Sequence, residues 1–272
     1  MSLSKWVSNN KSLMEHAYDP CTEDKATVKV LGLQWNVTED CFSFAGLDVK
    51  ANFESLVTKR GVLSWLAKLF DPLGFISPFV MYIKILFQDV WRLGLTWDEV
   101  LPNELLAKFH NWLTDTYVLQ SWKIKRCYFP GNELKSLKGL ELHAFCDASE
   151  KGYGACIYLP IPLAYDRYEV CFVLSKGRVA PIKSLTLPRL ELLGALLCAR
   201  LVQFVKSALH MDLPVFCWTV STIVLSWISK HPSEWKTFVR NKSDRFRQWH
   251  QQMIGFTVQG RLILVISFLE MC

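Results

Sequence analysis

Two acidic residues, Asp147 and Glu191, stand in sequence contexts in which a carboxylate could do chemistry. Asp147 lies near the end of the alternating segment LELHAFCDAS, whose pattern is typical of a half-buried strand. Glu191 lies near the start of a long apolar helix pattern. Burying a carboxylate among apolar groups costs free energy unless it is paired or bound to a cation. Carboxylates on a strand end and on the following helix are what a pair of hard divalent cations needs for phosphodiester hydrolysis.

Structural roles are open for both acids. The turn residues Ala-Ser-Glu-Lys-Gly follow Asp147 directly, so this aspartate could cap a turn. Glu191 could instead be favoured by the dipole at the helix N-terminus. The residue types alone leave these roles open beside the metal-binding one.

The elements around the acids predict an α/β region in the second half of the chain and a different region before it. The second half is expected to contain strands at 140–149, 152–159, 169–181 and 213–220, and helices at 185–209 and 221–230. In the first half, β-forming residues predict a hairpin of two strands at 28–37 and 41–47. Three amphipathic segments, beginning at Thr58, after Pro78 and after Pro102, predict a helical bundle.

The polar stretch 130–139 contains a proline and two glycines and lacks periodicity, so we expect a linker there. The predicted division is then 1–129, the linker 130–139, a domain over 140–245 and a tail over 246–272.

Composition limits the class of protein. Of 272 residues, 51% are hydrophobic and 21% charged, which excludes a disordered chain. The net charge of +6 is compatible with a polyanionic partner. With nine cysteines, no C-x-x-C spacing and no signal peptide, we expect reduced thiols in an intracellular protein of the cytoplasm or nucleus. The uninterrupted apolar stretches are too short for a bilayer, so no membrane contact is expected.

Several long blocks carry a resemblance to a known family. LHAFCDASEKGYGACIYL, SLTLPRLELLGALLCARL and CWTVSTIVLSWI resemble the ribonuclease H-like region of the Pol polyproteins of Bel/Pao-class LTR retrotransposons. KVLGLQW, TKRGVLSWLAKLFDPLGFISPF and ILFQDVWRLGLTWDEVLP resemble the segment between the polymerase palm and that region. The resemblance extends to about residue 245. It implies an α+β or α/β chain: a β-hairpin and a helical bundle like a reverse transcriptase thumb or connection, then a mixed five-stranded sheet flanked by helices.

The resemblance also implies an activity, hydrolysis of the RNA strand of an RNA–DNA hybrid with Mg²⁺ or Mn²⁺. Asp147 matches the family's first catalytic aspartate and Glu191 its helix glutamate, so both are expected to be metal ligands. The third acid of the family belongs to a W-T-D-S motif, where this chain has Trp-Thr-Val220-Ser221. A valine cannot ligate a cation, so we expect a weak or inactive nuclease, a pseudoenzyme of a transposable element. Ser149, Lys151 and Ser221 are expected to contact nucleic acid.

The end of the chain also departs from the family. Residues 246–272 lack the Asn-Pro-Ala-Asp type of motif that supplies the last family acid, and we interpret them as a degenerate or frame-altered tail, with an edge strand possible. Two alternatives remain. In one, Glu150 or Asp244 replaces the missing ligand and the nuclease works. In the other, a host has retained a non-enzymatic module that binds nucleic acid or protein.

Other activities of such polyproteins are not expected. The chain contains neither the paired aspartates of a polymerase palm nor the Asp-Thr/Ser-Gly of an aspartic protease. The partners that the resemblance implies are an RNA–DNA hybrid or another nucleic acid, and the remaining Pol segments. His143 shares the strand face of Asp147, where a hydrogen-bonded histidine is favoured over a metal ligand. Basic clusters such as the one at 240–247 could hold phosphates, although such charges usually form a solvated face.

Overall fold

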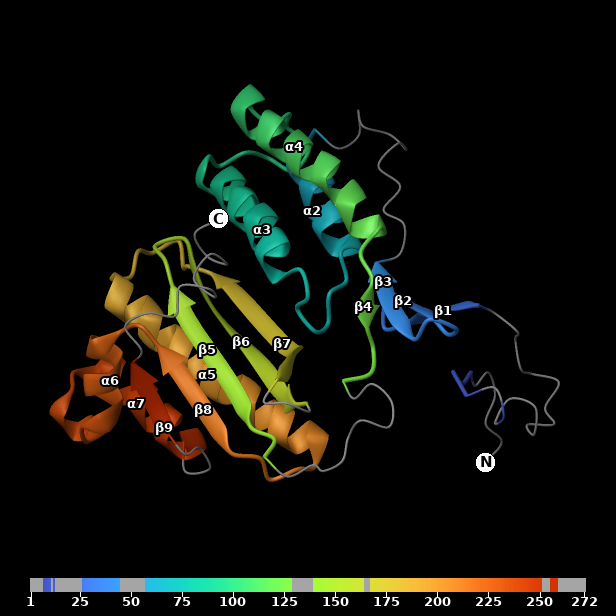
Figure 1. Cartoon of the computed structure of the whole chain (residues 1–272). Helices are drawn as coiled ribbons and strands as arrows, with labels where there is room; N and C mark the ends of the chain where they lie inside the picture. The colour runs from blue at the N-terminus through green and yellow to red at the C-terminus, as the bar shows by residue number, and fades with distance from the viewer. Residues whose placement is uncertain are drawn as a thin grey trace, which may run out of the picture. The chain divides into compact units, whose positions relative to one another are not determined.

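The computed structural model describes residues 7–10, 12, 26–44, 57–128, 139–163, 167–250 and 255–258. The chain forms two compact units, one comprising 1–72 and 97–130 and the other 73–96 and 131–272 (Figure 1). The predicted linker at 130–139 lies outside the described residues apart from Gly139. The linker and the domain boundaries drawn around it therefore stay predictions.

The first unit contains a four-stranded antiparallel sheet in the order β1-β2-β3-β4. Its strands are β1 (Thr27–Val30), β2 (Leu33–Asn36), β3 (Cys41–Phe44) and β4 (Ile124–Lys125). The prediction of one strand over 28–37 is wrong, because the chain reverses at Leu31 and Gly32, whose φ angles are 48° and 81°. Glycine suits this turn because its φ is positive and because a Cβ at Gly32 would overlap the Phe70 ring.

Two helices complete the described part of the first unit, α2 (Lys59–Lys68) and α4 (Asn103–Gln120). The start of α2 is fixed by Thr58, whose Oγ1 accepts a hydrogen bond from the Gly61 amide at 3.2 Å. The start of α4 follows Pro102, whose fixed φ suits the entry to a helix. The two amphipathic helices bury large apolar side chains: Val62, Trp65, Leu105, Phe109, Trp112 and Leu113.

The remaining predicted helix of the bundle, α3 (Ser77–Arg92), belongs to the second unit and packs against strand β7 (Tyr168–Val179). The Ser175 hydroxyl donates to Ser77 Oγ at 2.7 Å, and Gln88 Nε2 donates to a backbone carbonyl at 2.6 Å. The amphipathic pattern predicts this helix as part of a bundle within residues 1–129. Amphipathicity shows that a helix needs an apolar partner, but it does not identify the partner.

The second unit is built on a mixed five-stranded sheet in the order β7-β6-β5-β8-β9 (Figure 1). The other strands are β5 (Leu142–Ala148), β6 (Gly152–Pro162), β8 (Val215–Thr219) and β9 (Gly255–Val258). The pairs β5-β6 and β6-β7 are antiparallel, whereas β5-β8 and β8-β9 are parallel. This confirms the predicted mixed sheet flanked by helices. β9 falls within the segment interpreted as a degenerate tail and forms an edge strand.

The long helix α5 (Leu187–Leu209) lies against one face of this sheet (Figure 1). Three buried thiols, those of Cys146, Cys198 and Cys217, meet between the helix, β5 and β8. Hydrogen bonds between the protonated Cys198 thiol and the other two sulfurs, together with burial, raise the pKa of Cys198 well above its ordinary value. Among the described helices, α5 alone is long and apolar enough to cross a membrane by composition, yet half of that window is buried. It has the contacts of a core helix.

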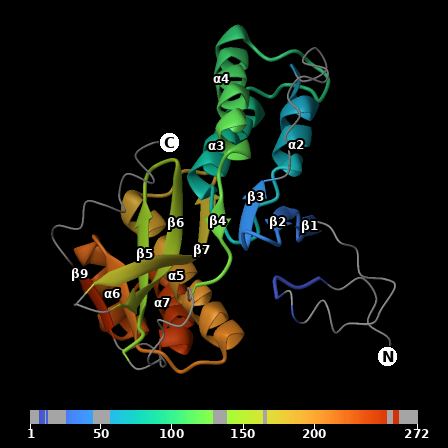
Figure 2. The same ribbon diagram turned by 45° about the vertical axis from the view of Figure 1, so that its right-hand side comes forward.

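The last described helices are α6 (Thr222–Ser229), which follows β8 almost directly, and α7 (Thr237–His250). A short 3-10 helix, Pro232–Glu234, separates them. α7 packs against both α5 and α6, as Figure 2 shows from a second direction.

Candidate functional site

The predicted site lies where β5 and β8 end. These strands are parallel and pair Cys146 with Thr219, so the next residues, Asp147 and Val220, emerge at the same edge of the sheet. Cys146 is buried on the side of α5, and by strand alternation Asp147 points to the opposite side. The positions that the resemblance assigns to the first and third acids are therefore neighbours in the fold.

Helix α5 approaches this edge closely at Gly194. A Cβ built on Gly194 would lie 3.1 Å from the backbone oxygen of Asp147, tighter than ordinary van der Waals contact. Glu191 is three residues earlier and therefore lies on the same face of the helix. The helix and the strand that carry the two predicted acids thus meet at one place. The signal in the sequence is a glycine inside an otherwise apolar helix pattern, which often marks close packing.

The Glu191 carboxylate is held by Ser221, the residue after Val220. Ser221 Oγ donates to Glu191 Oε2 at 2.7 Å, and it accepts a hydrogen bond from the Val224 amide at 3.2 Å. Ser221 is buried, at 6% exposure, and is the N-cap of α6. One hydroxyl therefore joins the acid on α5 to the end of β8 and the start of α6. Ser221 is expected from the resemblance to contact nucleic acid, and its bond to Glu191 was not predicted.

The helix dipole does not account for Glu191. α5 begins at Leu187 and has no acid in its first turn, so Glu191 lies beyond the region where the dipole effect is felt. Asp147 retains a local role, because its Oδ1 accepts a hydrogen bond from the Ala148 amide at 2.8 Å, as a turn-capping aspartate does. Val220 is 45% exposed, so an apolar side chain faces solvent at the residue before Ser221.

The other predicted contact residues lie in the turn between β5 and β6. Ser149 exchanges backbone hydrogen bonds with Gly152, at 2.8 and 3.3 Å, and its Oγ accepts from the Lys151 amide at 3.3 Å. Lys151 is exposed, and so is Glu150. Asp244, the other candidate for a replacement ligand, is exposed on α7. The roles assigned to these residues stay predictions.

The donors at this edge do not fit a pair of divalent cations. Such a pair requires several oxygen ligands, and here the described residues that the resemblance assigns to the site are two carboxylates, one bonded to Ser221, and a valine. In the part of the chain that the structure describes, no group of three or more His, Cys, Asp or Glu residues could hold a metal ion.

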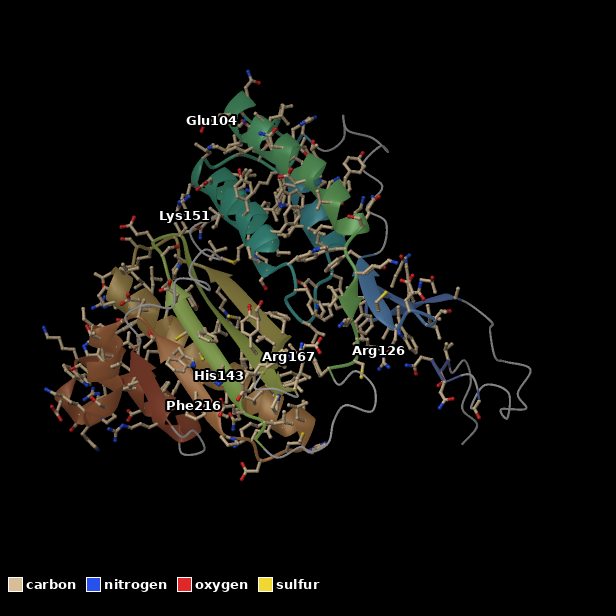
Figure 3. All side chains as sticks on the ribbon, in the orientation of Figure 1. Glu104, Arg126, His143, Lys151, Arg167 and Phe216 are labelled. Atoms are coloured by element: carbon tan, nitrogen blue, oxygen red, sulfur yellow. The ribbon has the colours of Figure 1, made fainter. Side chains whose placement is uncertain are left out.

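His143 is satisfied by hydrogen bonds, as predicted. Its Nδ1 lies 3.1 Å from the Nε1 of Trp218, an atom that only donates, so Nδ1 is the acceptor. Its Nε2 then carries the proton and donates to Glu141 Oε1 at 2.8 Å. The ring stacks on those of Trp218 and Phe216, with centroids 5.8 and 5.4 Å away, and Figure 3 shows His143 beside Phe216 on the sheet. Both ring nitrogens are occupied, so His143 is not available as a ligand.

Comparison with known proteins gives one family and one fold. Residues 58–221, more than half of the chain, match the family described as Pao retrotransposon-like RNaseH-like domain. No curated protein matches the chain in sequence. A foamy viral protease-reverse transcriptase in complex with double-stranded DNA is 12% identical, with a TM-score of 0.52 over 88% of this chain and 38% of that chain. This likeness shows the fold, and the chain spans well under half of the viral protein.

Two further solved structures are less similar. The foamy viral protease-reverse transcriptase in complex with an RNA/DNA hybrid is 12% identical, with a TM-score of 0.49 over 89% of this chain and 30% of that chain. RNase H1 from the halophilic archaeon Halobacterium salinarum is 14% identical, with a TM-score of 0.28 over 44% of this chain and 83% of that chain.

Proposed function

Because this chain belongs to the family of Pao retrotransposon-like RNaseH-like domains, we propose that its second unit binds an RNA–DNA hybrid or a related nucleic acid and cleaves it weakly or not at all. The first unit would be the thumb- or connection-like part of a Bel/Pao Pol polyprotein that precedes the ribonuclease H-like part. Other Pol segments would be its protein partners.

The observation that carries this proposal is the edge where β5, β8 and α5 meet. Asp147 lies at the end of β5 and Glu191 on the helix that packs closely against it, and the resemblance assigns the first two acids of the family to these elements, which supports a site descended from a nuclease. Val220 contributes no oxygen ligand, and the Glu191 carboxylate is held by the Ser221 hydroxyl. Binding does not require the missing carboxylate, because phosphate contacts depend on basic and hydrogen-bonding groups. Cleavage does require it if the cations are to be held.

The experiment compares three forms of the whole chain on a labelled RNA–DNA hybrid with magnesium: the natural chain, Val220→Asp, and Val220→Asp with Asp147→Asn. We expect negligible cleavage by the natural chain. Val220→Asp should recover part of the activity, because the last family acid is still absent. Asp147→Asn should remove what was recovered, and hybrid binding measured in the same samples should persist in all three.

A working nuclease predicts a different pattern. Robust magnesium-dependent cleavage by the natural chain that disappears in the single variant Asp147→Asn would overturn the proposal. Glu150→Gln and Asp244→Asn would then show whether either acid supplies the missing ligand. Failure of the natural chain to bind any hybrid or duplex would reject the nucleic-acid part of the proposal.

A further inference from the structure

Helices α5 and α7 carry positively charged residues on the sides that face each other. Arg200 of this group lies nine residues after Glu191 on α5. Arg189 and Arg200 are eleven residues apart, about three turns of α5, so they lie on the same side of that helix. The Arg189 guanidinium lies over the ring of Phe238, 5.0 Å from its centroid, which shows that this side faces α7. On α7, Lys242 and Arg245 follow Phe238 at spacings of four and seven, and so share its face.

Arg200, Lys242 and Arg245 form a cluster of like charges, which we call the α5-α7 cationic cluster. Burial, followed by the charges of Arg245 and Arg200, lowers the pKa of Lys242 below its ordinary value. Among the described residues, no carboxylate belongs to the groups that shift the pKa of Lys242, and Asp244 is exposed on the same helix. Arg200 and Arg245 are also exposed, so the cluster is accessible to a ligand.

Three cations on one side of two packed helices match the repeated negative charges of a phosphate backbone, so their field favours a polyanion at this surface. Additional cations on and before α7, namely Lys236, Arg240 and Arg247, extend the positive field. The Arg247 guanidinium already donates to the carbonyls of Ser229 and Lys230, so we leave it out of the cluster.

Resting on the proposed function, we propose that the α5-α7 cationic cluster is a second nucleic-acid contact, at which Arg200, Lys242 and Arg245 bind backbone phosphates away from the edge that carries Asp147 and Glu191. The ligand class is the sugar-phosphate backbone of a duplex. Contacts of this kind position the nucleic acid without reading its sequence.

The test measures binding of a 20-base-pair RNA–DNA hybrid, and of a DNA duplex of equal length, at several salt concentrations. The whole chain is compared with Arg200→Gln/Lys242→Gln/Arg245→Gln. A matched control removes three exposed cations outside the cluster, Lys176, Arg178 and Lys183, by the same change to glutamine. Both triple variants carry the same net charge, so a difference between them reports position. Circular dichroism and thermal unfolding of each variant confirm that it is folded.

In the cluster variant, we expect the slope of log affinity against log salt to become less negative by about 2 to 3. Each lost phosphate contact on a duplex reduces the magnitude of this slope by about 0.9. The control should keep the slope of the natural chain. Equal changes in both variants, or an unchanged slope in the cluster variant, would overturn the inference while leaving the proposed function intact. Loss of binding in the natural chain itself would reject both. Binding to anionic phospholipid vesicles without binding to nucleic acid would also overturn the inference.

Discussion

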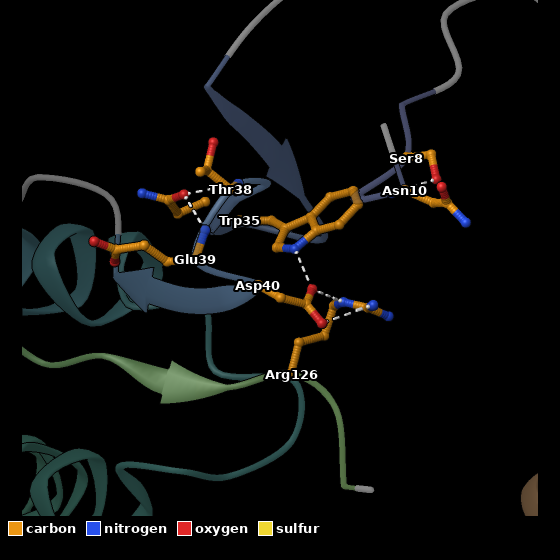
Figure 4. Close-up of polar contacts among 8 residues, drawn as sticks. Ser8, Asn10, Trp35, Thr38, Glu39, Asp40 and Arg126 are labelled. Carbon is orange, nitrogen blue, oxygen red and sulfur yellow. Dashed lines mark hydrogen bonds and ion pairs between the residues drawn. The ribbon is translucent and has the colours of Figure 1, made fainter. Parts of the chain in front are cut away.

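Asp40 in the first unit and Glu191 in the second are both held by hydrogen bonds, but their partners differ in charge. Asp40 accepts from Arg126 Nε at 2.6 Å and Nη2 at 3.1 Å, and from Trp35 Nε1 at 2.9 Å (Figure 4). Glu191 accepts from the neutral hydroxyl of Ser221. Among the ion pairs of the described residues, Asp40 has a cationic partner and Glu191 has none.

The difference lies in the charge of the hydrogen-bond partner: a guanidinium for Asp40 and a neutral hydroxyl for Glu191. The charge of Asp40 is neutralised within the chain, and the bond fastens the turn before β3 to the residue after β4. The Ser221 hydroxyl fixes the position of Glu191 without neutralising it. A carboxylate that is held in place by a neutral hydroxyl is the kind of ligand that a cation site requires.

Ser221→Ala should have the largest effect, because one buried hydroxyl serves both Glu191 and the Val224 amide. We expect the free energy of unfolding of the second unit to fall by about 2 kcal/mol, from the lost helix cap and the lost bond to a carboxylate. Thermal unfolding measures the loss, and hydrogen exchange of peptides from α6 locates it. Ser221→Thr retains the hydroxyl and should stay within about 0.5 kcal/mol of the natural chain. Equal losses in both variants would show that the hydroxyl is not responsible.

Asp40→Ala should cost less, about 1 kcal/mol, because this ion pair is partly exposed and screened by solvent. Its matched control is Asp98→Ala. Asp98 makes the same two-point contact with Arg60, at 2.7 and 2.9 Å, but the side chains are 73% and 64% exposed. We expect a smaller loss at that position, because solvent screens an exposed ion pair more strongly. Hydrogen exchange in β3 measures the loss of stability. An equal loss in Asp40→Ala and Asp98→Ala would show that the partly buried ion pair is worth no more than the exposed one.

The smallest expected effect is the pH dependence of the stability that Asp40 contributes. The hydrogen bonds from Arg126 hold the pKa of Asp40 below its ordinary value, so its contribution to stability is present above the unfolded-state pKa and is lost as pH falls through the folded-state pKa. The difference in Tm between the natural chain and Asp40→Asn should therefore shrink from about pH 5 downwards. Exposed carboxylates such as Glu39 and Asp98 titrate in both chains and cancel in the comparison. A difference that is constant down to pH 2 would contradict this assignment.

The sequence predicts much of the second unit because its elements have long and regular patterns. The alternation before Asp147 and the apolar run through Glu191 correspond to β5 and α5, with boundaries within two residues. The hairpin at Leu31 and Gly32 was not predicted, because strand-forming residues continue across it and only the glycine signals a turn. The positive φ of Leu31 is imposed by the pairing of β1 with β2, which no local pattern reveals.

The candidate site was predicted less completely than the fold. Asp147, Glu191 and Val220 could be chosen from the resemblance, but the bond between Ser221 and Glu191 joins residues 30 positions apart. It depends on the packing of α5 against the end of β8, and a serine before TIVLSWI predicts only a helix cap. In the same way, the sequence shows the basic residues of α7 as a cluster. It does not show that Arg200 lies near them, because this depends on the packing of α5 against α7.

The rate at which each buried thiol is alkylated can report how often its unit opens. Only a thiolate reacts readily with an alkylating reagent, and burial raises the pKa of Cys156 to about 12. The thiols of Cys198 and Cys217, fully covered by α5 and the sheet, can be labelled only when that helix lifts. Exposed Cys127 should react at once, and buried Cys41 should follow the opening of the first sheet. A time course of labelling, read cysteine by cysteine in a mass spectrometer, would therefore report how often each half of the molecule opens under native conditions.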